Sequence, residues 1–174
     1  MQAQTTVHTR DLVELAKPSI TGLSVFMAVG GLWLVGATDP WVWFGTVVGV
    51  GLVVASANAI NMYLERDTDG LMQRTADRPL PAGRLSPAWA LAAGFAYGIL
   101  GVWALAAWTT PLTTMLASLS LVVYVGIYTP MKRHSPLALA VGALPGAAPP
   151  LLGTTAATGV IDGPGLVLFA VLFV

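Results

Sequence analysis

The chain has 174 residues, of which 56% are hydrophobic and 9% are charged, and its mean hydropathy is +0.76. A soluble domain carries about 25% charged residues, so this composition excludes an ordinary water-soluble fold. Eight basic residues balance eight acidic ones and there is no cysteine, which excludes a dedicated nucleic-acid surface, disulfides and thiolate metal sites.

Long apolar runs predict membrane-spanning helices in chain order. Residues 1–18 are polar, lack the layout of a signal peptide and are expected to lie outside the membrane. A transmembrane domain follows over 19–174, with expected spans at 19–37, 41–64, 87–108, 112–128 and 136–153 and a last run at 165–174. A span needs about 20 helical residues, so the last run is too short to cross a bilayer. We therefore expect an all-α polytopic membrane protein whose sequence stops in the middle of a helix.

The distribution of lysine and arginine predicts the orientation of these spans. All eight basic residues precede the first span, lie between the second and third, or lie between the fourth and fifth. The connections near Asp39, Thr110 and Asp162 contain none. By the positive-inside rule the basic side faces the cytoplasm, and the N-terminus with it, so the predicted location is the cell's inner membrane.

A row of polar side chains marks the end of the second span. Its members, separated by 3, 4 and 4 residues, are Asn58, Asn61, Glu65 and Asp69. On a helix this spacing places them on one face, and such oxygen ligands suit Mg²⁺ together with phosphate oxygens. Asp67 points the other way and would join only if the helix unwinds near Thr68. The alternative is that the two asparagines only hydrogen-bond between helices.

Basic side chains on the same side of the membrane predict an anion site. Guanidinium and ammonium groups bind phosphate oxygens and stabilise a diphosphate as it leaves. The residues expected to bind diphosphate are Arg66, Arg74, Arg78, Lys132 and Arg133, of which Arg78, Lys132 and Arg133 are the expected catalytic groups. Arg84 fits a phosphate contact and a lipid-headgroup anchor equally well. Three prolines at 145, 149 and 150 predict a broken fifth helix beside a cavity, or else a kinked structural helix.

Three segments, 61–84, 128–133 and 141–151, resemble the UbiA-type intramembrane prenyltransferases, and more narrowly their haem-farnesylating branch. The resemblance runs from about Leu15 onward. Asn61 matches the first place of the family's Asn-Asp-x-x-Asp-x-x-x-Asp motif, and Glu65 and Asp69 occupy the fifth and ninth places. Met62 replaces the first aspartate of that motif, and Asp67 is an additional carboxylate.

The resemblance implies a helical bundle of nine helices, of which this chain holds about five and a half. It implies two acidic motifs that hold Mg²⁺ and a prenyl diphosphate, the second lying beyond residue 174, so the fragment alone is expected to be inactive. The implied reaction transfers a farnesyl group from farnesyl diphosphate to a vinyl group of protohaem IX, giving haem O for terminal oxidase assembly. Haem is thus an expected substrate rather than a cofactor. Membrane lipid and haem A synthase are the other expected partners, and neither His8 nor His134 is assigned as a haem ligand.

Two other functions stay open from the sequence. One is prenylation of an aromatic ring, such as a quinone or chlorophyll precursor, by another UbiA-type enzyme. The other is a non-catalytic transport or assembly subunit. Transporters place ionisable residues near the middle of the membrane, whereas here the carboxylates gather at one membrane surface, which disfavours transport.

Overall fold

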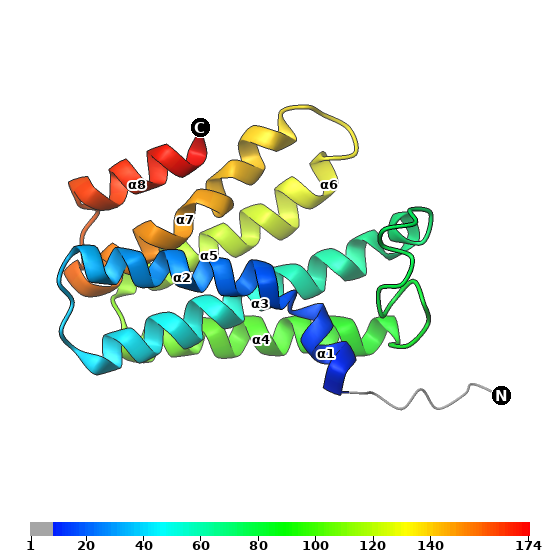
Figure 1. Cartoon of the computed structure of the whole chain (residues 1–174), viewed down its shortest axis with the longest axis horizontal. Coiled ribbons are helices and arrows are strands. Elements are labelled where there is room, and N and C mark those ends of the chain that lie inside the picture. Colours follow the sequence, from blue (N-terminus) through cyan, green and yellow to red (C-terminus); the bar gives the residue numbers. More distant parts are fainter. Residues whose placement is uncertain (1–8) are drawn as a thin grey trace.

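The computed structural model describes residues 9–174, and within this part the regular secondary structure is all helical. The long helices lie side by side in a bundle (Figure 1). In chain order the elements are α1 (Thr9–Leu15), α2 (Pro18–Leu34), α3 (Pro40–Asp69), α4 (Pro87–Trp108), α5 (Pro111–Val122), the π-helical turn η1 (Val123–Tyr128), α6 (Thr129–Met131), α7 (Ala138–Thr158) and α8 (Gly163–Phe173).

A polar cap residue with a proline in the first turn begins four of these helices. Asp39, Ser86, Thr110 and Asp162 each accept a hydrogen bond from a backbone N–H of the first turn. Proline within that first turn loses nothing by lacking an N–H, because these donors have no partner within the helix. The residues that end the apolar runs in the sequence therefore also start the following helices.

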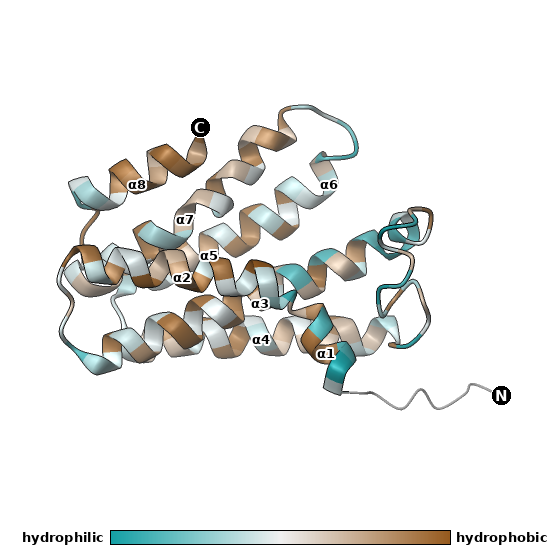
Figure 2. Cartoon of the chain, viewed as in Figure 1, coloured by the Kyte–Doolittle hydropathy of each residue, from teal (hydrophilic) through white to brown (hydrophobic). Residues whose placement is uncertain are grey.

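Three helices are long and apolar enough to cross a membrane: Pro40–Asp69, Pro87–Trp108 and Pro111–Met131. α1 and α2 form a fourth candidate if they are taken together as one span bent by 54°. α8 is a shorter apolar helix, and α7 lies at the place of the expected fifth span. Large apolar side chains cover the outside of the bundle, and hydrophilic residues concentrate at the loops (Figure 2).

Glycines let the helices approach closely. A Cβ atom on Gly101 of α4 would lie 2.8 Å from the backbone nitrogen of Val53 in α3. A Cβ atom on Gly153 of α7 would meet the backbone of Ala28 and Leu32 in α2 within 3.0 Å. Small residues at such crossings are typical of helix packing in membranes, where dispersion contacts between backbones stabilise the bundle.

Two helices differ from the expected spans in ways that bear on function. α3 continues past residue 64 to Asp69, so the whole polar row is helical. The expectation of a broken fifth helix is wrong, because α7 continues without interruption through Pro145, Pro149 and Pro150. Proline removes one helical hydrogen bond at each position, but helices packed on both sides hold α7 together.

Candidate active site

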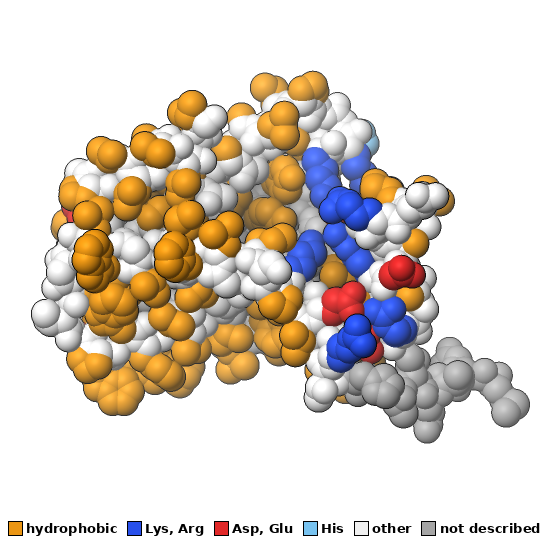
Figure 3. Space-filling view, viewed as in Figure 1, with side chains coloured by type: hydrophobic (Ala, Val, Ile, Leu, Met, Phe, Trp, Pro, Cys, Tyr) orange, Lys and Arg blue, Asp and Glu red, His pale blue; other side chains and the backbone are white. Residues whose placement is uncertain are grey.

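A polar cavity opens at the end of the bundle that carries the α3–α4 loop and the α6–α7 turn. Its volume is about 420 Å³. Blue side chains gather around this end in Figure 3, while the rest of that face is largely apolar. The residues that line the cavity are Lys17, Asn61, Glu65, Thr68, Asp69, Met72, Arg74, Arg78, Tyr124, Lys132 and Arg133.

The last turns of α3 supply the acidic side of the cavity. Asn61, Glu65 and Asp69 are 2%, 8% and 5% exposed, so the 3.6-residue period turns all three toward the inside of the bundle. The Nδ2 atom of Asn61 donates to Oε2 of Glu65 at 2.8 Å. The α3–α4 loop folds back over this end, and Thr75 Oγ1 donates to the backbone oxygen of Asp69 at 2.8 Å.

Each buried carboxylate is paired with a cation from another segment. Arg78 of the α3–α4 loop donates to Asp69 Oδ2 at 2.5 Å, and Lys132 of the α6–α7 turn pairs with Glu65. Arg133 donates to the backbone oxygen of Leu64 at 3.1 Å, which fixes the turn against α3. Paired charges make the burial of these carboxylates tolerable. The cavity lining still holds more cations than carboxylates, so it attracts anions.

A π-helical turn brings Thr129 against Asn61. Thr129 is 2% exposed, and its Oγ1 lies 3.1 Å from Asn61 Oδ1 and 2.8 Å from the backbone oxygen of Tyr124. An i→i+5 turn is rare and widens the helix, which is often seen at functional sites. Here it sets the rotation of 129–133, so that both Thr129 and Lys132 face α3.

Lys17 lines the cavity, although its sequence position predicted only that it lies on the basic side of the membrane. It lies between α1 and α2 with φ 47° and ψ 73°, a left-handed conformation that costs about 1–2 kcal/mol for a residue with a Cβ. Burial lowers the pKa of Lys17 to about 8, with a further lowering from Arg78, while Glu65 and Asp69 raise it. The sequence feature that could have identified Lys17 as a site residue is its position just before Pro18, at the start of a predicted span. No sequence pattern marked Tyr124 or Met72 as a site residue.

Several predicted site residues lie outside the polar cavity. The side chain of Asp67 is 81% exposed and is 3.7 Å from Arg66, because α3 does not unwind near Thr68. Arg66 donates to the backbone oxygen of Tyr63 and lies over the Tyr63 ring. Asn58, one turn before Asn61, donates to the backbone oxygen of Ala16 at 3.3 Å.

Within residues 9–174, the polar cavity lining contains no histidine. His134 is exposed, and its Nδ1 is 3.1 Å from the backbone oxygen of Pro130. His8 lies outside the described residues.

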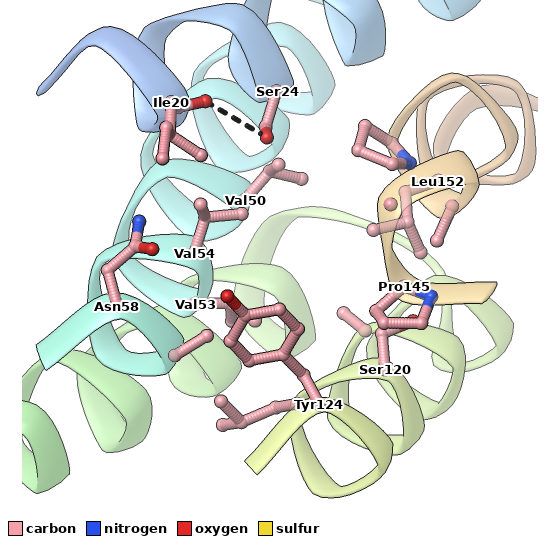
Figure 4. A pocket seen from close by; sticks show the side chains of 16 residues that line it. Ile20, Ser24, Val50, Val53, Val54, Asn58, Ser120, Tyr124, Pro145 and Leu152 are labelled. Atoms are coloured by element: carbon pink, nitrogen blue, oxygen red, sulfur yellow. Dashed lines mark hydrogen bonds between the residues drawn. The ribbon is translucent and has the colours of Figure 1, made fainter. Parts of the chain in front are cut away.

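An apolar cavity adjoins the polar one inside the bundle. Tyr124 lines both cavities, and Asn58 stands at the same end of the apolar one (Figure 4). The remaining lining comes mainly from aliphatic side chains of α3 and α7, including Val50, Val54 and Leu152. Pro145 and Pro149 also line it, so the proline-rich part of α7 forms one wall, as the sequence indicated.

The oxygen atoms in the polar cavity fit a metal ion that is carried in with phosphate. Within residues 9–174, no three His, Cys, Asp or Glu side chains are grouped as a metal site. The cavity offers two carboxylates and the amide of Asn61 instead. Mg²⁺ is commonly held by one or two carboxylates together with substrate phosphates and water, so the arrangement suits a magnesium diphosphate and not a bare ion.

Comparisons with known proteins agree with this architecture. A solved structure of a UbiA homolog from Archaeoglobus fulgidus, bound to GPP and Mg²⁺, superposes with a TM-score of 0.76 at 16% identity, over 94% of this chain and 60% of that one. This likeness shows the fold.

Curated relatives are similar in sequence over nearly the whole chain. The protoheme IX farnesyltransferase of Anaeromyxobacter sp. (strain Fw109-5) is 50% identical over 167 residues, which are 95% of this chain and 56% of the relative. That of Sorangium cellulosum is 54% identical over 127 residues, 73% of this chain and 45% of the relative. The chain thus spans about half the length of these relatives. The model of the UbiA prenyltransferase family matches residues 24–174, and the chain therefore belongs to the UbiA prenyltransferase family.

Proposed function

We propose that the protein transfers a farnesyl group from farnesyl diphosphate to a vinyl group of protohaem IX, giving haem O. The observation that carries this proposal is that two buried carboxylates and five cations line one cavity, and that this cavity meets an apolar cavity at Tyr124. A polar site for a diphosphate next to an apolar site for its tail matches the two halves of a prenyl diphosphate. The name of the relatives in Anaeromyxobacter and Sorangium supports farnesyl as the group transferred and protohaem as its acceptor.

In this proposal Asn61, Glu65 and Asp69 hold Mg²⁺, and the cations of the cavity hold the diphosphate. Mg²⁺, when bound, neutralises charge that develops on the departing diphosphate. The solved A. fulgidus homolog is bound to GPP and Mg²⁺, which supports this pairing of metal and diphosphate. Arg66 and Asp67 stand outside the cavity, so the proposed site uses Arg74, Arg78, Lys132 and Arg133.

The ion pairs of the free site suggest how the substrate is received. Lys132 on Glu65 and Arg78 on Asp69 keep the cations close to the place of the diphosphate before it binds. On binding, each cation exchanges its carboxylate for phosphate oxygens, and the carboxylates become free for the metal. Since the charged groups are already in place, little reorganisation is needed when negative charge grows on the leaving group.

The proposed chemistry is an alkylation followed by capture of water. The bond between C1 of the farnesyl group and the diphosphate oxygen breaks, and the diphosphate keeps the electron pair. The terminal carbon of the vinyl group forms the new carbon–carbon bond with C1. Water then adds to the other vinyl carbon and loses a proton, which leaves a hydroxyl group. The apolar lining around Val54 and Leu152 would keep water away from the allylic cation until the vinyl group reacts.

The same proposal fixes the orientation in the membrane. The protein is multi-pass. Five of its eight lysines and arginines line the polar cavity, Arg10 and Arg84 line a second pocket with Asp77 of the α3–α4 loop, and Arg66 lies in the last turn of α3. From the positive-inside rule we propose that the cavity and the start of the chain lie on the cytoplasmic side of the inner membrane. A contact with haem A synthase, as the enzyme that takes up the product, stays a prediction.

The test is an acceptor competition in nanodiscs. The full-length protein is incubated with Mg²⁺, farnesyl diphosphate and equal amounts of protohaem IX and an aromatic quinone precursor, and the products are identified by mass spectrometry. Farnesylated hydroxyethyl haem is the expected product. Exclusive prenylation of the quinone precursor would assign the chain to the aromatic enzymes instead. Saturable binding of farnesyl diphosphate without any product would contradict the proposed transfer, and absence of binding would favour a non-catalytic subunit.

A further inference from the structure

Among the described residues, Lys17 is the one residue other than glycine with a positive φ. Residues with a Cβ rarely adopt this conformation, and they keep it where surrounding contacts impose it. The backbone around it is well bonded: Lys17 N donates to Glu14 O at 3.1 Å, and Lys17 O accepts from Ile20 N and Thr21 N at 3.0 Å. These bonds direct the Lys17 side chain into the polar cavity lining, which it joins from a separate helix pair.

The bend that contains Lys17 is fixed to α3 from one side. The backbone oxygen of Ala16 accepts from Thr21 Oγ1 at 2.5 Å and from Asn58 Nδ2 at 3.3 Å. Leu15 is fully buried in a cluster formed mainly by α3, α4 and the loop between them. The other buried members of that cluster are Ala59, Met62, Leu80, Leu85 and Ala90.

Arg84 fixes α1 from the other side. Its Nε donates to Asp11 Oδ1 at 2.9 Å and its Nη2 to Glu14 Oε2 at 3.0 Å. Its Nη1 donates to the backbone oxygen of Asp77 at 2.8 Å, next to Arg78 in the chain. Asp11 is 3% exposed, so this contact is buried at its acidic end. The sequence left Arg84 between a phosphate ligand and a lipid anchor. In the structure it is absent from the polar cavity lining and joins α1 to the loop that carries Arg74 and Arg78.

We infer that Arg84 is a positioning residue for the diphosphate site: by holding Asp11 and Glu14 of α1, it keeps Lys17 turned into the polar cavity as an additional diphosphate ligand. This inference rests on the proposed function, because it names a ligand of the same diphosphate. It assigns α1 a role in the site even though no side chain of α1 lines the polar cavity. A single guanidinium group thereby links the Lys17 and Arg78 sides of the site through its contacts with Asp11, Glu14 and the Asp77 carbonyl.

The test is a double-mutant cycle on diphosphate binding. The dissociation constant of magnesium farnesyl diphosphate is measured in nanodiscs for the full-length wild type and for its Arg84→Gln, Lys17→Met and double variants. Each single variant is expected to bind about tenfold more weakly, the size of a lost hydrogen bond to a charged group. The double variant is expected to bind no more weakly than Lys17→Met, because Arg84 acts through Lys17. Arg84→Lys should recover only part of the affinity, since an ammonium group cannot reproduce three directed contacts.

Two controls separate positioning from damage to the fold. Arg10→Gln removes an exposed charge from the same helix, next to Asp11, and should leave the dissociation constant unchanged. Lys17→Gly suits the left-handed conformation, so it should lose affinity while its unfolding temperature stays at or above that of the wild type. The inference would be overturned if the effects of Arg84→Gln and Lys17→Met were additive, or if either variant bound with wild-type affinity. In both cases, binding of farnesyl diphosphate by the wild type would still support the diphosphate site. A wild type that does not bind farnesyl diphosphate would remove the proposed function as well.

Discussion

Arg78 Nη1 lies 2.5 Å from Asp69 Oδ2, although the two residues are nine positions apart and belong to a loop and a helix. Asp67, two residues before Asp69 on α3, turns its carboxylate outward, where 81% of the side chain is exposed. The same chemical group thus occurs in two environments within one turn, and this contrast separates a site carboxylate from a surface one.

The pair Asp69→Asn and Asp67→Asn tests this contrast. Asp69→Asn removes a buried charge, leaves Arg78 without its partner and should lower farnesyl transfer at least a hundredfold, about 3 kcal/mol in transition-state stabilisation. Asp67→Asn should keep most of the activity. The measurement is kcat/KM of the full-length protein for farnesyl diphosphate at fixed Mg²⁺. Equal losses in the two variants would mean that α3 unwinds in the working enzyme.

Thr129 is expected to act on the metal ligands through Asn61. Its hydroxyl lies 3.1 Å from Asn61 Oδ1, and Asn61 in turn donates to Glu65, so Thr129 holds the amide in the orientation that Glu65 requires. Thr129→Val keeps the shape but leaves a buried amide oxygen unpaired, at a cost of about 1–3 kcal/mol. The Mg²⁺ concentration for half-maximal activity should rise. Thr129→Ser, which retains the hydroxyl, should restore it, and failure of serine to do so would point to packing alone.

The binding of farnesyl diphosphate should depend on pH through Lys17. Burial lowers the pKa of this amine to about 8, and the charged groups around it are Arg78, Glu65, Asp69 and Lys132. Below that value Lys17 is protonated and attracts the diphosphate, and above it the charge is lost. Affinity is therefore expected to fall by roughly tenfold as the pH rises through about 8, the size of one charged hydrogen bond.

Lys17→Arg provides the control for this pH dependence. An arginine stays charged over the whole range, so the step near pH 8 should disappear. The measurement is the dissociation constant from pH 6.5 to about 9, compared between the two proteins. A step of the same size and midpoint in Lys17→Arg would assign the titration to another group.

Two adjacent glycines of α2 test how tightly it packs on α7. A Cβ atom at Gly31 would lie 3.1 Å from the Thr154 nitrogen and closer still to the Pro150 carbonyl, whereas one at Gly30 meets nothing within 4 Å. Gly31→Ala should destabilise the bundle by about 1–3 kcal/mol through overpacking. Gly30→Ala should be neutral or stabilising by up to about 1 kcal/mol, because alanine favours the helix. Thermal unfolding in detergent measures both, and equal unfolding temperatures would contradict this close packing.

The helical class and the acidic side of the site could be predicted from the sequence because both follow from periodicity. Apolar length indicates membrane helices, and the 3–4–4 spacing places Asn61, Glu65 and Asp69 on one face wherever a helix continues. The family resemblance was confirmed by the family comparison and the relatives. These features depend on residues close together in the chain.

Long-range contacts account for what the sequence could not indicate. In our inference, Lys17 joins the cavity because Arg84, 67 positions later, holds α1 in place. The contacts of Arg84 with Asp11 and Glu14 join distant parts of the chain, so no local sequence pattern indicates them. Arg66 is an exception, because the contact that holds its side chain outside the cavity is local and involves Tyr63, three positions earlier on α3. The prolines of α7 indicated a cavity wall, and the structure has one there. They also predicted a broken helix, because the sequence does not show the neighbouring helices that stabilise α7 despite the hydrogen bonds lost at each proline.

The π-helical turn at Val123–Tyr128 has a consequence for how this protein tolerates insertions and deletions. A π-helical turn absorbs one extra residue, so removing one residue there would restore ordinary α-helical winding and leave the following residues facing nearly the same way. Removing one residue from α5 while the turn is kept would instead rotate everything after it by roughly 100°. The segment would still be long and apolar enough to insert into the membrane, but Thr129 and Lys132 would no longer face α3. Natural and engineered length variants should therefore be depleted in α5 far more than hydropathy suggests, and tolerated better within the turn itself.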